Sequence, residues 1–155
     1  MVIGNLGKAL GSFGAFVACS AVLREYLINT ARSFIFTCGL PAGPVAAART
    51  GLEIIRGREA WRGPKLLALA EQLRKGLLDA GYDVGRSSTQ IVPAVVGANQ
   101  RTMQLCEQAL ARGVYAQGIR FPSVPEGTAR IRFTPTCGHT PEDIDEVVSV
   151  FRALR

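Results

Sequence analysis

The sequence has little of the chemistry that metal sites require. Its only histidine is His139, and its four cysteines lie far apart and form no C-x-x-C pair. Zinc sites need several thiolates or imidazoles at short, regular spacings, so we expect no metal site. The cysteine spacing does not resemble a disulfide framework either. Because free thiols are typical of a reducing compartment, a cytoplasmic protein is predicted.

The sequence also lacks a cluster of basic residues. The net charge is +6, but the arginines are spread along the chain with no run of four, and aromatic residues make up only 7%. Nucleic-acid-binding proteins usually gather basic residues in one patch, so no nucleic-acid partner is expected. A basic balance suits small anionic ligands such as phosphates, carboxylates or coenzyme A. Otherwise the arginines lie on solvated helix faces.

No hydrophobic run long enough to cross a membrane is present. One stretch of apolar and small residues, 9–23, is interrupted by glycines and is shorter than the roughly 20 residues that span a bilayer. The lysine in front of it is itself preceded by apolar residues, whereas a signal peptide begins with basic residues. No membrane association is expected.

What the sequence does contain is the hydrophobic pattern of an α/β domain in residues 59–155. Residues 65–80 place leucines at helical spacing and are followed by Gly81, which favours a helix end. Residues 140–143, TPED, are typical of a helix start, with proline at the first helical position and acidic residues in the first turn. Pro93 predicts an edge strand or a bulge. We expect a small α/β sandwich with helices at 65–80, 99–112 (capped by Asn99) and 140–154, and strands at 91–96, 114–119 and 129–134.

Residues 1–58 have a different pattern. Their apolar segments are typical of buried strands, but they are too few to form a covered sheet. These residues therefore resemble the end of a larger domain. The predicted elements are strands at 1–3, 15–18 and 33–36, a helix from Ser20 to about Asn29, and a helix from Pro41 or Pro44 to about Arg56.

Lys8 has an unusual setting, because it lies among glycines at positions 4, 7, 11 and 14. Glycines permit positive φ and let a ligand approach the main chain closely. A lysine here can hold a phosphate, form a Schiff base or remain a solvated charge. A P-loop is excluded, because Val2 stands where its first glycine is needed and Ala9 where Ser or Thr follows the lysine.

Three ordered segments resemble the α-oxoamine synthases, a pyridoxal-phosphate family. GNLGKALGSFGAFV resembles the family's cofactor-lysine pattern G-T-x-G-K-A-x-G, and ARSFIFTCGLP is similar to A-R-S-F-I-F-T-T-x-L-P. FPSVPEGTARIRFTPTCGHTPEDID resembles the closing signature P-T-V-P-x-G-T-A-R-x-R and the helix opening H-T-x-E-D-I-D. The resemblance spans positions 4–145. It is strongest to the branch that acts in biotin synthesis, ahead of the glycine acetyltransferase and 5-aminolevulinate synthase branches.

The resemblance implies a fold-type-I transferase that uses pyridoxal 5'-phosphate. Residues 1–58 would be the C-terminal part of its large, cofactor-binding domain, and 59–155 its small domain. Lys8 would form the Schiff base with the cofactor, which requires the lysine to lose its proton. Asn5 stands where the family has a threonine that binds the cofactor phosphate. Thr37 matches a threonine that reaches the phosphate from the neighbouring subunit of a homodimer, and Cys38 replaces the second threonine of that pair.

The resemblance also implies the reaction, a decarboxylative condensation of an amino acid with an acyl thioester, either acyl-CoA or acyl-ACP. Arg132 matches the second arginine of the family's R-x-R, which binds the amino-acid carboxylate, and a guanidinium suits such a bidentate contact. Strand alternation places Arg130 on the same face as Arg132. Without the resemblance, both would be solvated arginines of an edge strand. Arg120 and Ser123 occupy the positions of the family's substrate loop.

Some family features have no counterpart in this sequence. The family carries two histidines and an aspartate upstream of the lysine, which contact the cofactor ring, its pyridine nitrogen and its oxygen. Here no acidic residue precedes Lys8, and His139 is expected only to help start the last helix. We interpret the chain as the C-terminal part of such an enzyme and expect no catalysis by it alone. The alternative is a non-catalytic remnant whose small domain serves as a binding or assembly module.

Overall fold

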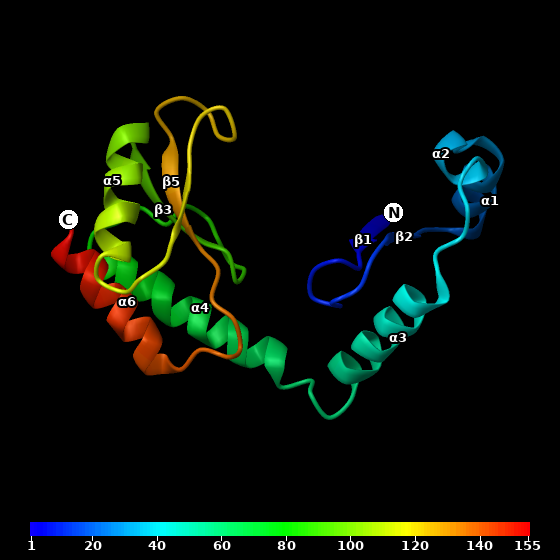
Figure 1. Cartoon of the computed structure of the whole chain (residues 1–155), viewed down its shortest axis with the longest axis horizontal. Helices are drawn as coiled ribbons and strands as arrows, with labels where there is room; N and C mark the ends of the chain where they lie inside the picture. The colour runs from blue at the N-terminus through cyan, green and yellow to red at the C-terminus, as the bar shows by residue number, and fades with distance from the viewer. The chain divides into compact units, whose positions relative to one another are not determined.

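The computed structural model describes all residues from Met1 to Arg155. The chain forms two compact units, residues 1–60 and 61–155, here called unit 1 and unit 2 (Figure 1). None of the helices is both long and apolar enough to cross a membrane. The four cysteines are free thiols.

Unit 1 consists of a two-stranded hairpin and three helices. The strands are antiparallel, with Asn5 opposite Ala15 next to the turn. The Ser20 hydroxyl caps the first helix by accepting a hydrogen bond from the Leu23 N–H at 3.4 Å. The elements are β1 (Val2–Asn5), β2 (Ala15–Ala18), α1 (Ala21–Thr30), α2 (Arg32–Ile35) and α3 (Ala42–Arg56).

The predicted strand at 33–36 is wrong. The Ala31 carbonyl accepts hydrogen bonds from the N–H groups of Phe34 and Ile35 at 2.9 and 3.0 Å, so this segment forms the single helical turn α2. A four-residue apolar run fits a helical turn as well as a strand. No strand pairs with this segment, and β-propensity depends on such pairing neighbours.

Unit 1 has almost no core of its own. Of its residues only Leu6 and Ala48 are buried, and neither face of the hairpin is covered. A two-stranded hairpin alone is at best marginally stable in water, because it leaves its apolar side chains exposed. Large exposed hydrophobic residues therefore gather in this unit, among them Ile3, Phe13, Phe34 and Phe36.

Unit 2 is a three-stranded antiparallel sheet whose one face is packed with helices. The strand order is β3-β5-β4, with β5 in the centre. Along β5, Ala129, Ile131 and Phe133 are buried, whereas Arg130 and Arg132 are not. This alternation leaves the opposite face of the sheet open. The elements are α4 (Arg62–Asp79), β3 (Val92–Gly97), α5 (Asn99–Leu110), β4 (Gln117–Ile119), β5 (Ala129–Phe133) and α6 (Pro141–Ala153).

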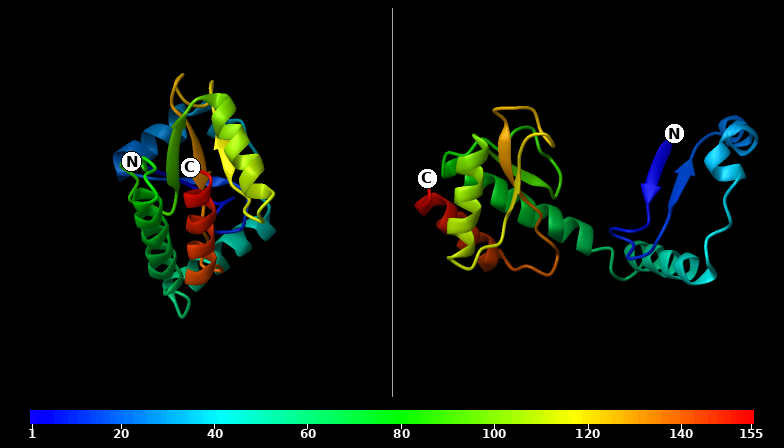
Figure 2. Two further views of the ribbon diagram at one scale, coloured as in Figure 1. Left: turned by 90° about the vertical axis from the view of Figure 1, so that its left-hand side faces the viewer. Right: turned by 45° about the horizontal axis from the view of Figure 1, so that its top comes forward.

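The core of unit 2 is centred on Phe151 of α6. Its ring packs edge-on against Phe133 and Tyr82, with ring centroids 4.9 and 6.0 Å apart. The Tyr82 hydroxyl donates to the Phe151 carbonyl at 2.9 Å, so its polar end is satisfied. Helices α4 and α6 lie side by side (Figure 2), and the lack of a side chain at Gly76 gives Val148 room at their contact.

Several local predictions can be compared with unit 2. Pro93 lies in the edge strand β3, which confirms the edge alternative of the proline prediction. Pro93 itself pairs regularly with Arg132, and the irregular pairing lies between Val95 and Gly97. The cap predicted at Asn99 is wrong by one residue, because Ala98 caps α5 without a side-chain hydrogen bond. The strand predicted at 114–119 is shorter than expected, since only β4 pairs with β5.

The start of α6 is confirmed in detail. Thr140 and Asp143 form a capping box, in which each side chain accepts a hydrogen bond from the other residue's backbone N–H, at 3.2 and 2.8 Å. The bond from the Thr140 N–H lowers the pKa of Asp143, because it favours the charged carboxylate. His139 is part of the preceding turn, where its Nδ1 accepts the Thr136 N–H at 2.9 Å.

Candidate functional site

Lys8 lies in the turn that joins β1 to β2. This turn is closed by backbone hydrogen bonds from the Leu6 N–H to Gly14 O and from the Ser12 N–H to Leu6 O, both 2.9 Å. Gly11 and Gly14 have φ of +58° and +104°, which side chains rarely tolerate, so glycine is required at both positions. The Lys8 side chain is exposed and makes no hydrogen bond or ion pair among the described residues. Its amine is therefore available to a ligand.

Helix α3 fixes the position of this turn. The Ser12 hydroxyl donates to the Pro44 carbonyl at 2.6 Å. A Cβ at Gly51 would lie 3.1 Å from the Leu10 carbonyl oxygen, so glycine lets α3 approach the turn closely. The turn that carries Lys8 is thus supported from outside the hairpin, although the rest of unit 1 is poorly buried.

Asn5 lies at the end of β1, and its side chain has a defined orientation. Its Oδ1 accepts the Gly7 N–H at 2.7 Å, which leaves the two N–H donors of its amide unused. Thr37 lies after α2, where its hydroxyl donates to the Cys38 carbonyl at only 3.4 Å. Thr37 is exposed, and no hydrogen bond joins it to Asn5 or Lys8.

Arg132 lies on the central strand of unit 2, on the open face of the sheet. Its side chain is exposed and makes no hydrogen bond or ion pair. Arg130, two residues earlier on the same face, is half-buried, and its Nε donates to the Thr128 carbonyl at 3.0 Å. The predicted shared face is therefore confirmed, but the two guanidinium groups differ in availability. Only Arg132 is unengaged.

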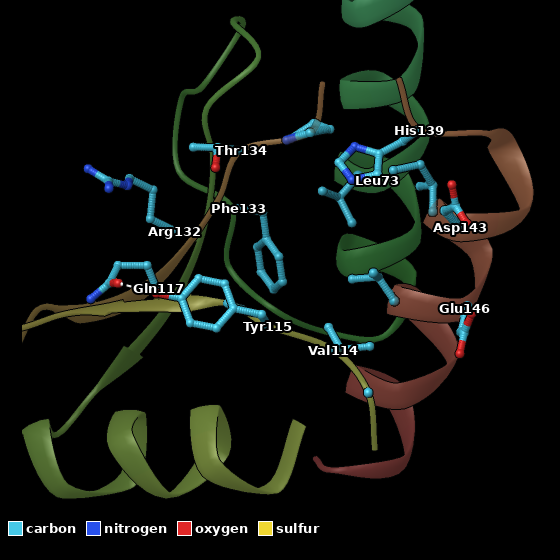
Figure 3. Close-up of a pocket in the computed structure, with 15 residues that line it drawn as sticks. Leu73, Val114, Tyr115, Gln117, Arg132, Phe133, Thr134, His139, Asp143 and Glu146 are labelled. Atoms are coloured by element: carbon cyan, nitrogen blue, oxygen red, sulfur yellow. Dashed lines mark hydrogen bonds between the residues drawn. The ribbon is translucent and has the colours of Figure 1, made fainter. Parts of the chain in front are cut away.

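Beside Arg132 the structure forms a cavity of about 470 Å³ (Figure 3). Arg132, Gln117 and Tyr115 lie at one end of it, and His139 and Asp143 at the other. Between them, Leu73, Val114, Phe133, Ile144 and Val147 supply apolar walls. Sequence reasoning missed Tyr115 and Gln117. The pairing of β4 with β5 could have identified Gln117, because it puts this residue opposite Arg132, and Tyr115 follows from its hydrogen bond to Gln117.

Arg120 and Ser123 lie just after β4. The Arg120 guanidinium donates to the Met103 sulfur of α5 at 3.2 Å, which places it on the helix-covered side of the sheet. The Ser123 N–H donates to the Arg120 carbonyl at 2.9 Å and closes a turn. Arg120 therefore points away from the open face that carries Arg132, and no hydrogen bond brings the two arginines together.

Comparisons with known sequences place these features in a family. Residues 1–151 match the sequence profile of the family described as "Aminotransferase class I and II". A protein of Geobacillus kaustophilus is 48% identical over 148 residues, which are 96% of this chain and 38% of that protein. The 8-amino-7-oxononanoate synthases of Geobacter sulfurreducens and Pelobacter propionicus are 46% and 44% identical, over 98% and 92% of this chain. The chain covers 39% and 37% of their respective lengths.

Solved structures show the same fold. Serine palmitoyltransferase from S. paucimobilis with a bound PLP–myriocin aldimine has a TM-score of 0.85 at 27% identity, over 98% of this chain and 38% of that one. An 8-amino-7-oxononanoate synthase from Francisella tularensis has a TM-score of 0.80 at 21% identity, over 97% of this chain and 44% of that one, which shows the fold alone. The α/β fold of pyridoxal-phosphate-dependent transferases is thus confirmed. The chain belongs to the class I and II aminotransferase family.

Proposed function

We propose that this chain supplies the cofactor lysine and the carboxylate-binding arginine of an 8-amino-7-oxononanoate synthase, which acts in biotin synthesis. The reaction joins L-alanine to a pimeloyl thioester, pimeloyl-CoA or pimeloyl-ACP, with loss of CO₂. The observation that supports it most is the unpaired Lys8 in a glycine turn braced by α3. The names of relatives 44–46% identical point to the same activity.

The residues around Lys8 fit pyridoxal phosphate. Lys8 offers a free amine for the cofactor's aldehyde, and Asn5 offers two unused amide N–H donors for its phosphate. At Gly11 a Cβ would meet nothing within 4 Å, so the main chain of the turn is open to a ligand. When bound, the cofactor supplies the electron sink for bond breaking at the amino acid's α-carbon. The exposed Thr37 is available to a second subunit, as the proposed homodimer requires.

Arg132 and the substrate loop complete the proposal. The Arg132 guanidinium would bind the amino-acid carboxylate through two parallel hydrogen bonds. Ser123 would contact the substrates from the loop after β4, and Arg120 would do so after its guanidinium turns away from the Met103 sulfur. The branches that use glycine, glycine acetyltransferase and 5-aminolevulinate synthase, remain alternatives in the same reaction class. A cytoplasmic location completes the proposal.

A second candidate is a non-catalytic binding or assembly module. The observation that favours it is the contrast between the two units, because unit 2 has a complete core and unit 1 has only two buried residues. In this case residues 61–155 would persist as a folded domain, and the Lys8 turn would bind no cofactor.

Reductive trapping distinguishes the two candidates. The protein is incubated with pyridoxal phosphate, and borohydride then reduces the bond between cofactor and lysine to a stable amine that mass spectrometry detects. We expect the label on Lys8, with Lys65 and Lys75 as internal controls for random modification, because those lysines lack the glycine turn. No label, or equal labelling of all three lysines, would favour the binding module.

A further inference from the structure

The open face of the unit 2 sheet surrounds its two arginines with different neighbours. Arg132 pairs with Pro93 of β3 on one side and Gln117 of β4 on the other. Residues directly opposite on antiparallel strands have Cβ atoms about 4.5–5.5 Å apart. Gln117 is therefore the polar neighbour of Arg132 across the sheet, and it projects from the same face.

Arg130 has no such neighbour. It pairs with Val95 and Ile119, and both of these side chains are apolar. Its own Nε is already engaged with the Thr128 carbonyl. Of the two arginines on this face, Arg132 alone has both a polar cross-strand neighbour and a guanidinium that makes no hydrogen bond.

The Gln117 amide is held in a single orientation. Its Oε1 accepts the Tyr115 hydroxyl at 3.0 Å (Figure 3), and its Nε2 donates to the Gly118 carbonyl at 3.2 Å. A side-chain amide nitrogen carries two hydrogens, so one N–H donor remains unused. That donor belongs to the residue directly opposite the unengaged Arg132 on the neighbouring strand.

These contacts do little for the fold itself. Gln117 is exposed, and both of its hydrogen bonds go to residues within two positions of it in the sequence. Tyr115 is 75% exposed, so its ring adds little to the core. An exposed aromatic ring that orients an exposed amide next to a free cation suits a ligand site better than a structural contact.

We propose that Gln117 binds the amino-acid carboxylate together with Arg132, and that Tyr115 is the positioning residue that orients the Gln117 amide. The guanidinium donates two hydrogen bonds to the carboxylate oxygens, and the remaining Gln117 N–H donates a third. A carboxylate has about four acceptor sites, so three donors can be accommodated. This inference rests on the proposed function, because its ligand is the carboxylate of the amino-acid substrate.

The test needs neither cofactor nor acyl thioester. The ¹⁵N-labelled chain is titrated with sodium propionate, which carries the carboxylate of alanine without its amine, and with sodium chloride at equal ionic strength. We expect the side-chain NMR signals of Arg132 Nε–H and Gln117 NH₂ to move together and to saturate at the same propionate concentration. The Arg130 Nε–H signal should stay in place. Chloride should move none of them.

Variants then separate binding from folding. Gln117→Ala loses a hydrogen bond to a charged group and should bind propionate about tenfold more weakly. Tyr115→Phe loses only the orientation of that amide and should bind about threefold more weakly. The thermal unfolding of both variants should be unchanged. In Tyr115→Phe the Gln117 NH₂ signal should also move less on titration, which a purely structural tyrosine would not explain. The matched control is Ile119→Gln, which places an amide opposite Arg130 and should leave propionate affinity unchanged.

Two results would overturn the inference. In the first, propionate moves the Arg132 signal but not the Gln117 signals, and Gln117→Ala binds propionate as well as the parent. In the second, propionate does not move the Arg132 signal at all, which would mean that Arg132 binds no carboxylate. Both differ from a failure of the proposed function, because that appears as missing cofactor label on Lys8 and is measured in a separate experiment.

Discussion

At the scale of single residues, the two arginines of β5 have identical side chains that differ in their hydrogen bonding. The residue spacing places both on one face of a strand, and the structure confirms this. What distinguishes them is local bonding, since Arg130 donates to the Thr128 carbonyl and Arg132 donates to nothing. The bond from Nε fixes the direction of the Arg130 guanidinium, whereas the Arg132 guanidinium has all five N–H donors unused and can turn to meet a ligand.

We therefore predict different kinetic effects for the two arginines. In a chimera that carries residues 1–155 in place of the matching part of the Geobacter sulfurreducens relative, Arg132→Ala should raise the KM for the amino acid roughly 10- to 100-fold. This range follows from the loss of a charge-assisted bond worth about 1.5–3 kcal/mol. The KM for the thioester should change far less, and Arg130→Ala should leave both near the parent value. Steady-state kinetics with each substrate varied in turn measures this.

Two outcomes would reassign the site. If Arg130→Ala damages amino-acid binding while Arg132→Ala does not, the carboxylate lies on the other arginine. If Arg132→Ala raises mainly the thioester KM, this arginine belongs to the acyl pocket instead.

At the scale of secondary-structure elements, the start of α6 makes stability depend on pH. The Asp143 carboxylate accepts the Thr140 N–H, which lowers its pKa below the ordinary value of 3.8. Because the pKa of Asp143 is lower in the folded than in the unfolded chain, the charged carboxylate stabilises the fold fully at pH values above the unfolded-state pKa. The stabilisation is lost as the pH falls through the folded-state pKa. Asp143→Asn should therefore lower the melting temperature at neutral pH and bring it level with the parent in acid.

Thermal unfolding followed by circular dichroism from neutral to acidic pH checks this. Glu146→Gln, on the same helix, exposed and outside the capping box, is the control and should leave the acid limb of the curve intact. An unchanged pH dependence in Asp143→Asn would show that the box does not contribute to it.

The elements also show what the sequence can and cannot predict. The start of α6 was predictable because Thr140 and Asp143 interact within one four-residue segment. Pro93 likewise indicated an edge strand or a bulge, and β3 is an edge strand. The segment 33–36 was not, because its choice between strand and helix depends on neighbours far away in the chain. The same holds for the site. Arg132 was proposed from the resemblance of its R-x-R segment to the family, whereas Gln117 needed the pairing of β4 with β5.

At the scale of the whole molecule, burial is unequal between the two units. Residues 61–155 contain the continuous core around Phe151, whereas residues 1–60 bury only Leu6 and Ala48. Segments with few buried apolar contacts open most readily, and exposed apolar surface promotes association. We predict that brief trypsin digestion cleaves unit 1 at Arg24, Arg32 and Arg49 and leaves a stable fragment of about residues 61–155.

Mass spectrometry of the fragments over time, combined with light scattering of the intact chain, measures this. Arg74 of α4 is the internal control, because its side chain is only 13% exposed and is paired with Glu71. Protection of residues 1–60 in a protein that scatters as a monomer would contradict the prediction.

The closure of the core within unit 2 has a consequence for engineering and for the family's history. Unit 2 carries its own hydrophobic core and also the Arg132 face. If the amino acid binds at Arg132 and the cofactor at Lys8, as proposed, selection for a new amino acid could act on residues 61–155 while the residues of the lysine turn stay the same. Recombination with the break near Ala60 and Trp61 would be the simplest route, because the division between the two units falls there.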